Sequence, residues 1–322
     1  MLHAHRSLWA VVVWASMTAA AAADPLPGQK LKFQQLPMVA TPIGGTLYYG
    51  HDELSTAVLA PPDPSQPQRY DGQFMADDFA DPFEQEIVHV RWWGSYLDAP
   101  NGPPKAVDKF LISFESDVPV GPDNPFSHPG TPLLNQIVFK GPLAPASGTF
   151  TETLLRGPDP LLSEALFEYN AELMLPFHQN KDTVYWLKIV ALTEPAQQQP
   201  PVLWGWHNRD YTVMDPFASV APAVVPGEYL DGTLPSGEPI WHFQDDAVSG
   251  IMTALVVDPK TVTIDQTRYA PENYRAPFDG PTLIANHSKD LAFELYYVPE
   301  PGTLAMLAIG VGLLALRRKR RA

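Results

Sequence analysis

The segment "DTVYWLKIVAL" (residues 182–192) has the clearest periodicity in the chain. Its odd-numbered side chains, from Tyr185 to Ala191, fall on one face of an extended backbone, and its even-numbered side chains fall on the other. A period of two is the pattern of a β-strand, whereas a helix repeats every 3.6 residues. We therefore predict a strand with one apolar face and with Lys188 on the opposite face.

Other segments repeat this pattern. "KFLISFESDV" (109–118) and "DLAFELYYV" (290–298) alternate in the same way, and weaker strand candidates lie at residues 87–93, 135–141, 251–257 and 261–264. Residues 163–173 fit a short helix or a strand, and their alternation favours the strand. The 36 prolines of the chain oppose long helices, because proline breaks helix interiors. We predict an all-β fold, a single jelly-roll-like β-sandwich, since the apolar face of one sheet is usually covered by a second sheet.

The first residues have the features of a signal peptide. Arg6 lies in a weakly basic start, residues 8–14 are apolar, and Ala21 and Ala23 form an A-x-A cleavage pattern. We predict cleavage between Ala23 and Asp24 after export by the Sec machinery. The alternative is an uncleaved anchor, although the apolar part is short for the ~20 residues of a spanning helix.

We divide the chain into four parts. They are a signal peptide (1–23), an extended N-terminal segment with the first strands and a proline-rich connector (24–69), a β-sandwich domain (70–297) and a C-terminal sorting segment (298–322).

Charge and cysteine content exclude several functions. Residues 24–298 contain 15 basic and 35 acidic residues, a net charge of −20. Such a surface repels phosphate backbones, so we expect no nucleic-acid partner, and it suits solubility outside the cell. The chain has no cysteine, which excludes disulfides, thiol catalysis and cysteine-ligated zinc.

The chain ends in "VPEPGTLAMLAIGVGLLALRRKRRA" (298–322). From Leu304 to Leu316 there are 13 uncharged residues, and a helix of that length extends about 20 Å, short of the roughly 30 Å hydrocarbon core of a bilayer. Basic residues that follow an apolar helix stay on the cytoplasmic side; here they are Arg317, Arg318, Lys319, Arg320 and Arg321. We predict a short transmembrane helix that resides in the inner membrane only transiently. A permanent tail anchor is the alternative.

This tail resembles the PEP-CTERM sorting signal of exported Gram-negative proteins. The resemblance rests on Pro299, Glu300 and Pro301, on the apolar run and on the basic end. It implies recognition by an exosortase, a membrane transpeptidase-like enzyme, and cleavage near these three residues. The expected destination is the cell surface or the exopolysaccharide matrix.

The body of the chain also has a resemblance. Residues 76–98, 184–192, 203–210 and 290–296 are similar to an uncharacterised extracellular β-sandwich domain that is frequent among PEP-CTERM proteins. The resemblance implies an architecture and a location, and it assigns no activity.

Aromatic residues are the first candidates for a binding site. Trp92 and Trp93 are adjacent on a predicted strand and must point to opposite faces, so at most one can enter the core of a single buried face. Exposed aromatic rings near polar groups suit sugar rings. We therefore consider an extracellular polysaccharide as a partner, held by Trp93, Tyr96, Trp206, Asn208 and Asp210. The alternative is that these tryptophans fill the core.

Acidic residues are weaker candidates. Asp77, Asp78 and Asp81 provide oxygen ligands for a calcium ion, and the alternative is that they are solvated turn residues. We expect no other cofactor. The sequence has no H-E-x-x-H, G-x-S-x-G or G-x-G-x-x-G motif. We therefore predict a non-enzymatic surface or matrix protein, with a polysaccharide-binding module as the alternative and an extracellular glycan hydrolase as a less favoured one.

Overall fold

The computed structural model describes residues 25–97, 106–158, 165–195, 202–215, 227–234, 236–272 and 289–299. These ranges contain strands, turns and loops and no helix, which confirms the predicted all-β class. None of their segments is a helix long and apolar enough to cross a membrane. The predicted signal peptide and the predicted helix over residues 304–316 lie outside these ranges.

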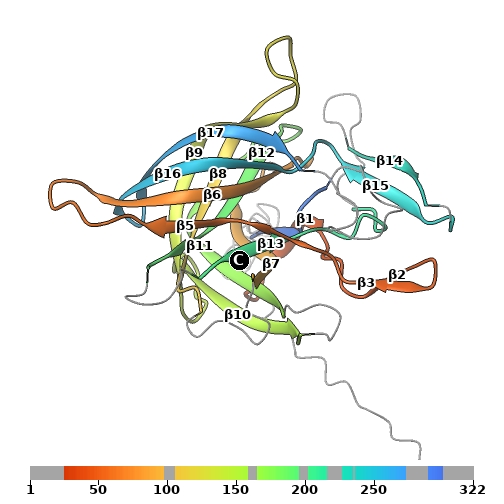
Figure 1. Cartoon of the computed structure of the whole chain (residues 1–322), viewed down its shortest axis with the longest axis horizontal. Coiled ribbons are helices and arrows are strands. Elements are labelled where there is room, and N and C mark those ends of the chain that lie inside the picture. Colours follow the sequence, from red (N-terminus) through yellow and green to blue (C-terminus); the bar gives the residue numbers. More distant parts are fainter. Residues whose placement is uncertain are drawn as a thin grey trace, which may run out of the picture.

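Figure 1 shows the strands coloured in chain order, from red to blue. They are β1 (Lys30–Gln35), β2 (Thr41–Ile43), β3 (Thr46–Tyr48), β4 (Asp52–Leu54), β5 (Thr56–Leu59), β6 (Gln68–Phe79), β7 (Ile87–Tyr96), β8 (Lys109–Val118), β9 (His128–Lys140), β10 (Thr149–Arg156), β11 (Leu166–Phe177), β12 (Tyr185–Thr193), β13 (Trp204–His207), β14 (Glu228–Thr233), β15 (Pro239–Phe243), β16 (Val248–Asp258), β17 (Thr261–Pro271) and β18 (Phe293–Tyr297).

Within the described ranges, 14 of the strands form one large mixed sheet. Its order is β1-β18-β7-β11-β10-β9-β8-β12-β5-β6-β16-β17, and β13 joins β4 to β7. The sheet curls on itself (Figure 1), so that β17 at one end of the order contacts β9 in its middle. The cover for each apolar face therefore comes from the same sheet. The N-terminal segment is part of it, because β1 pairs with β18 and β5 pairs with β6.

The curl encloses two hydrophobic cores. The inner core contains Trp92, Phe110, Tyr169 and Trp204, whose rings pack edge to face or stacked. The second core lies on the other face of β6, β8 and β12, where the β16–β17 hairpin covers Trp186 and its neighbours. The hairpins β2–β3 and β14–β15 extend from one side of the sheet (Figure 1) and share a smaller apolar cluster.

Strand β12 lies between the two cores, and all nine of its residues are buried. Leu187 and Ile189 belong to the inner core, whereas Trp186 and Val190 belong to the second core. The prediction of a single apolar face for this segment is therefore wrong. The reason is that the curled sheet covers β12 from both sides, which alternation alone does not reveal.

Lys188 is the one charged residue of β12, and its side chain is fully buried. Its Nζ lies 2.5 Å from Glu115 Oε1 and 4.0 Å from the centre of the Phe74 ring, and it also contacts Gln266. Gln266 in turn donates to the second oxygen of Glu115 at 2.6 Å. Burial lowers the pKa of Lys188, and the Glu115 carboxylate opposes this effect. The ammonium is therefore tolerated only because a carboxylate is buried with it.

We expect Lys188→Ala to lower the free energy of unfolding by about 3–5 kcal/mol, because it leaves Glu115 as an unpaired buried charge. The double variant Lys188→Met/Glu115→Gln removes both charges and keeps an amide beside Gln266. It should recover most of the loss, as measured by urea denaturation. Equal losses in the two variants would contradict this account of the pair.

Candidate functional site

The five residues predicted to hold a sugar are all buried, and none is more than 8% exposed. Trp206 lies in the inner core, where its Nε1 donates to the carbonyl oxygen of Ala292 at 2.9 Å. The Tyr96 hydroxyl donates to Glu152 and accepts a hydrogen bond from the Val107 amide. The predicted exposed aromatic platform is therefore wrong, and the aromatic rings fill the fold.

The two polar members of that set bind the chain itself. Asn208 Oδ1 accepts a hydrogen bond from the His51 amide at 2.5 Å. One oxygen of Asp210 accepts from the Thr41 hydroxyl at 2.6 Å, and the other accepts from the amide of Thr212 at 3.0 Å. These groups hold a turn in place and are not presented to a ligand.

Trp92 and Trp93 point to opposite faces of β7, as predicted, but both are buried. Trp92 stacks on Tyr169 in the inner core, with ring centres 5.3 Å apart. Trp93 packs on the outer face against Leu166 and Ala292. At most one of the two could enter the core of a single buried face, but the outer face of β7 has a cover and a small apolar cluster of its own, so both are buried.

Around Trp93, the outer face of β18, β7 and β11 carries a concentrated set of polar side chains, which we name the β7 polar cluster. His89 Nδ1 lies 2.7 Å from Glu172 Oε1. Arg91 donates to Glu294 and to Asn170, both at 2.9 Å. The full cluster consists of His89, Arg91, Glu168, Asn170, Glu172, Glu294 and Tyr296.

The β7 polar cluster is buried and internally bonded. Burial raises the pKa of Glu168, and the Arg91 guanidinium opposes the rise. Burial and the neighbouring Glu294 raise the pKa of Tyr296. Gln29, which precedes β1, donates to both oxygens of Glu172 at 2.9 and 3.0 Å. A satisfied network of this kind rigidifies the strands that it joins.

Sequence reasoning missed this cluster, although a signal was present. His89 and Arg91 lie two residues apart in an otherwise apolar segment. Glu168, Asn170 and Glu172 are likewise spaced two residues apart on another predicted strand. Same-face polar residues on two predicted strands indicate a polar face. That these strands are neighbours follows only from the register, in which Asn170 lies opposite Arg91.

The three aspartates considered for calcium diverge. Asp77 and Asp78 are successive residues of β6 and point to opposite faces, and Asp77 accepts from the Leu291 amide at 2.6 Å. Asp81 lies 3.5 Å from Lys32 Nζ. In the part of the chain that the structure describes, no three carboxylate or imidazole groups are placed to hold a metal ion. The predicted grouping is wrong, and so is the solvated alternative, because all three residues are buried.

Asp78 is a buried carboxyl group whose two oxygens have no hydrogen-bond donor among the described residues. The negative charges of Asp245, Asp77, Asp290 and Asp117 also act on it. Burial, reinforced by these charges, raises the pKa of Asp78 well above its ordinary value. The folded protein therefore favours the neutral acid at this position.

This burial gives stability a pH dependence with a defined sign. The folded-state pKa of Asp78 exceeds its unfolded value of about 3.9, so its contribution to stability is complete below that pH and is lost as the pH rises through the folded pKa. Asp78→Asn mimics the neutral acid. Urea denaturation between pH 4 and 8 should show a flatter pH profile for the variant, by up to about 1.4 kcal/mol per pH unit, and higher stability at neutral pH.

The matched control is Asp123→Asn in an exposed turn, which should keep the wild-type profile. Parallel profiles for Asp78→Asn and the wild type would show that Asp78 is ionised in the folded state at all of these pH values.

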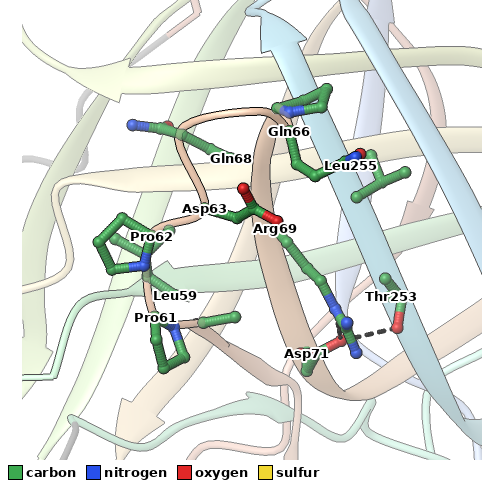
Figure 2. A pocket seen from close by; sticks show the side chains of 12 residues that line it. Leu59, Pro61, Pro62, Asp63, Gln66, Gln68, Arg69, Asp71, Thr253 and Leu255 are labelled. Carbon is green, nitrogen blue, oxygen red and sulfur yellow. Dashed lines mark hydrogen bonds and ion pairs between the residues drawn. The ribbon is translucent and has the colours of Figure 1, made fainter.

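An open hollow of about 660 Å³ lies beside the loop that joins β5 to β6 (Figure 2). Arg69 Nε donates to Asp71 at 2.9 Å, and the Thr253 hydroxyl donates to the same oxygen at 2.7 Å. Figure 2 shows Pro61 and Pro62 across the hollow from these polar groups. We name this site the β5–β6 groove; it is lined by Leu59, Ala60, Pro61, Pro62, Asp63, Gln66, Pro67, Gln68, Arg69, Asp71, Thr253 and Leu255.

The groove offers hydrogen-bonding groups that solvent can reach. The side chains of Arg69 and Asp71 are 57% and 39% exposed, in contrast to the β7 polar cluster. A surface ion pair contributes little to stability, so a ligand can compete for its donors and acceptor at small cost. The groove is therefore suited to a neutral polar ligand that also presents an apolar face to prolines.

The fold and the tail together define a class: an all-β body followed by a short C-terminal sorting segment. Residues 298–321 match the PEP-CTERM protein-sorting motif, which confirms the predicted signal. Residues 31–295 match the model of a family described as a domain of unknown function, DUF7901, and the chain belongs to this family. No curated protein and no solved structure matches the chain. The sorting motif identifies an exported protein that is targeted to an exosortase.

Proposed function

We propose that this protein is a non-enzymatic component of the cell surface or of the exopolysaccharide matrix of a Gram-negative bacterium. The Sec machinery exports it, the tail holds it briefly in the inner membrane, and an exosortase cleaves the tail near Pro299–Pro301. The observation that carries this proposal is the sorting motif at residues 298–321, which begins directly after β18 ends at Tyr297.

The state of the buried polar groups supports the non-enzymatic part of the proposal. His89 is held between Glu172 and Asn170, and His207 is held between Asp52 at 3.0 Å and the carbonyl of Met38 at 3.0 Å. A general acid or base must reach a substrate proton within hydrogen-bond distance. These imidazoles instead connect strands to one another, which favours a structural role.

Processing gives the sharpest test. Mass spectrometry of the released protein should find an amino terminus at Asp24 and a carboxy terminus between Val298 and Pro301. Glu300→Ala should leave uncut protein in the membrane fraction, whereas Asp123→Ala, a control on an exposed turn of the body, should be released normally. Recovery of the intact basic end from the matrix would contradict the proposed processing.

Polysaccharide binding is a second candidate, and the β5–β6 groove favours it. Sugar hydroxyls suit Arg69, Asp71 and Thr253, and the C–H faces of sugar rings suit the proline wall. This assignment replaces the buried residues that the sequence had suggested.

We expect Arg69→Gln to weaken retention in a gel containing the organism's purified exopolysaccharide by roughly 10- to 100-fold, the loss of one charged hydrogen bond. Arg268→Gln on the exposed edge strand β17 makes the same charge change away from the groove and should bind normally. Equal weakening in both variants would indicate nonspecific charge attraction, and no retention of the wild type would exclude this function.

A further inference from the structure

Both ends of the body emerge at one end of the sheet. Strands β1 and β18 are antiparallel neighbours, and the first residue of β1, Lys30, pairs with the last residue of β18, Tyr297. Tyr297 also pairs with Ile87, where β7 begins, and Ile87 pairs with Phe177, where β11 ends. The loops before β7 and after β11 therefore surround the point at which the tail leaves the body.

These loops are locked to one another by buried charges. Lys32 Nζ donates to the carbonyls of Phe83 and Gln85 at 3.1 and 2.6 Å and lies 3.5 Å from Asp81. Gln179, from the loop after β11, donates to Asp81 at 2.8 Å and to Phe83 at 3.2 Å. Lys32 and Asp81 are both buried, so the two loops form one preorganised surface. We name it the tail platform, residues 81–86 and 178–182.

Tyr297, the last residue before the tail, contacts this platform. The ring of Phe83 stacks on that of Tyr297, with centres 6.2 Å apart and planes 20° apart. The next residue, Val298, is 53% exposed, so the chain leaves the surface there. Glu84 and Glu86 are the exposed acidic residues of the loop, directly beside this exit.

The connection to the membrane is short. Six residues, 298–303, separate Tyr297 from the start of the apolar run at Leu304. Fully extended, they span about 20 Å. Strand β6 alone has 12 residues and extends about 40 Å away from the platform to the β5–β6 loop. While the tail is in the membrane, the tail platform therefore stays within about 20 Å of the bilayer, whereas the far end of β6 can lie about 40 Å further away.

We propose that the tail platform is the surface on which the membrane-embedded processing enzyme seats the folded body, with Glu84 and Glu86 as its contact residues. This inference rests on the proposed processing by an exosortase. In this proposal the enzyme recognises the motif in the tail. The platform fixes the position and direction in which the chain leaves the body, just before that motif. The negative charges of these contact residues would pair with positive charge on the enzyme.

The test uses the full-length chain in its producing cells and measures the rate of tail removal by pulse-chase. The double variant Glu84→Lys/Glu86→Lys should slow tail removal at least fivefold. The control Asp258→Lys/Asp265→Lys makes the same charge change at two exposed positions of the β16–β17 hairpin, toward the far end of β6, and should be processed at the wild-type rate. Thermal unfolding of each purified variant establishes that the body is folded.

A flexible ten-residue Gly/Ser insertion between Tyr297 and Val298 provides a second measurement. It releases the motif from the platform, so the lysine substitutions should lose most of their effect in the lengthened chain. Equal processing rates for the platform and control variants, in cells where Glu300→Ala still blocks processing, would overturn the inference alone. Normal processing of Glu300→Ala would overturn the proposed function itself.

Discussion

The burial of β12 on both faces is the constraint on which the rest of the structure depends. A strand between two cores contributes every side chain to the interior, so any charged residue that it carries must bring a partner with it. Buried charges elsewhere in the fold are paired in the same way. Lys32 is buried with Asp81, and Arg209 is buried with Glu228 and Asp290. The burial of these charged groups thus accompanies the covering of the chain around them and does not by itself mark an active site.

Asp78 is the exception that shows how this constraint works. It lies on the second-core face of β6, near Trp186, whose indole nitrogen donates to Asp117 at 2.9 Å and not to Asp78. The donors in this region are occupied by neighbouring acids, because Ser127 also donates to Asp117. A carboxyl group in such a place is tolerated by keeping its proton, whereas Glu115 is paired with the ammonium group of Lys188.

Alternation in the sequence predicted most of the strands, because a period of two is a local property. Residues 109–118 coincide with β8, and residues 166–173 of the ambiguous stretch belong to strand β11, as the alternation favoured. The prediction of the sugar-binding site was wrong because the exposure of a side chain depends on residues far away in the sequence. Trp93 and Trp206 are covered by residues from β18 and its approach, about 90 to 200 positions away along the chain. The sequence around each tryptophan does not show that a distant segment covers it. Aromatic residues that fill the core therefore resemble, in sequence, the residues of an exposed binding platform.

The position of β18 links the fold to the tail. This strand lies between β1 and β7, so it joins the first strand of the body to the rest of the sheet, and it is also the last strand within the described residues. The sheet is therefore complete only when the C-terminal residues have reached the same compartment as the rest of the body. Because β18 ends at Tyr297 and the sorting motif begins at residue 298, cleavage within the motif removes nothing that the sheet uses. A cut made within the motif after β18 has paired would therefore leave the sheet intact.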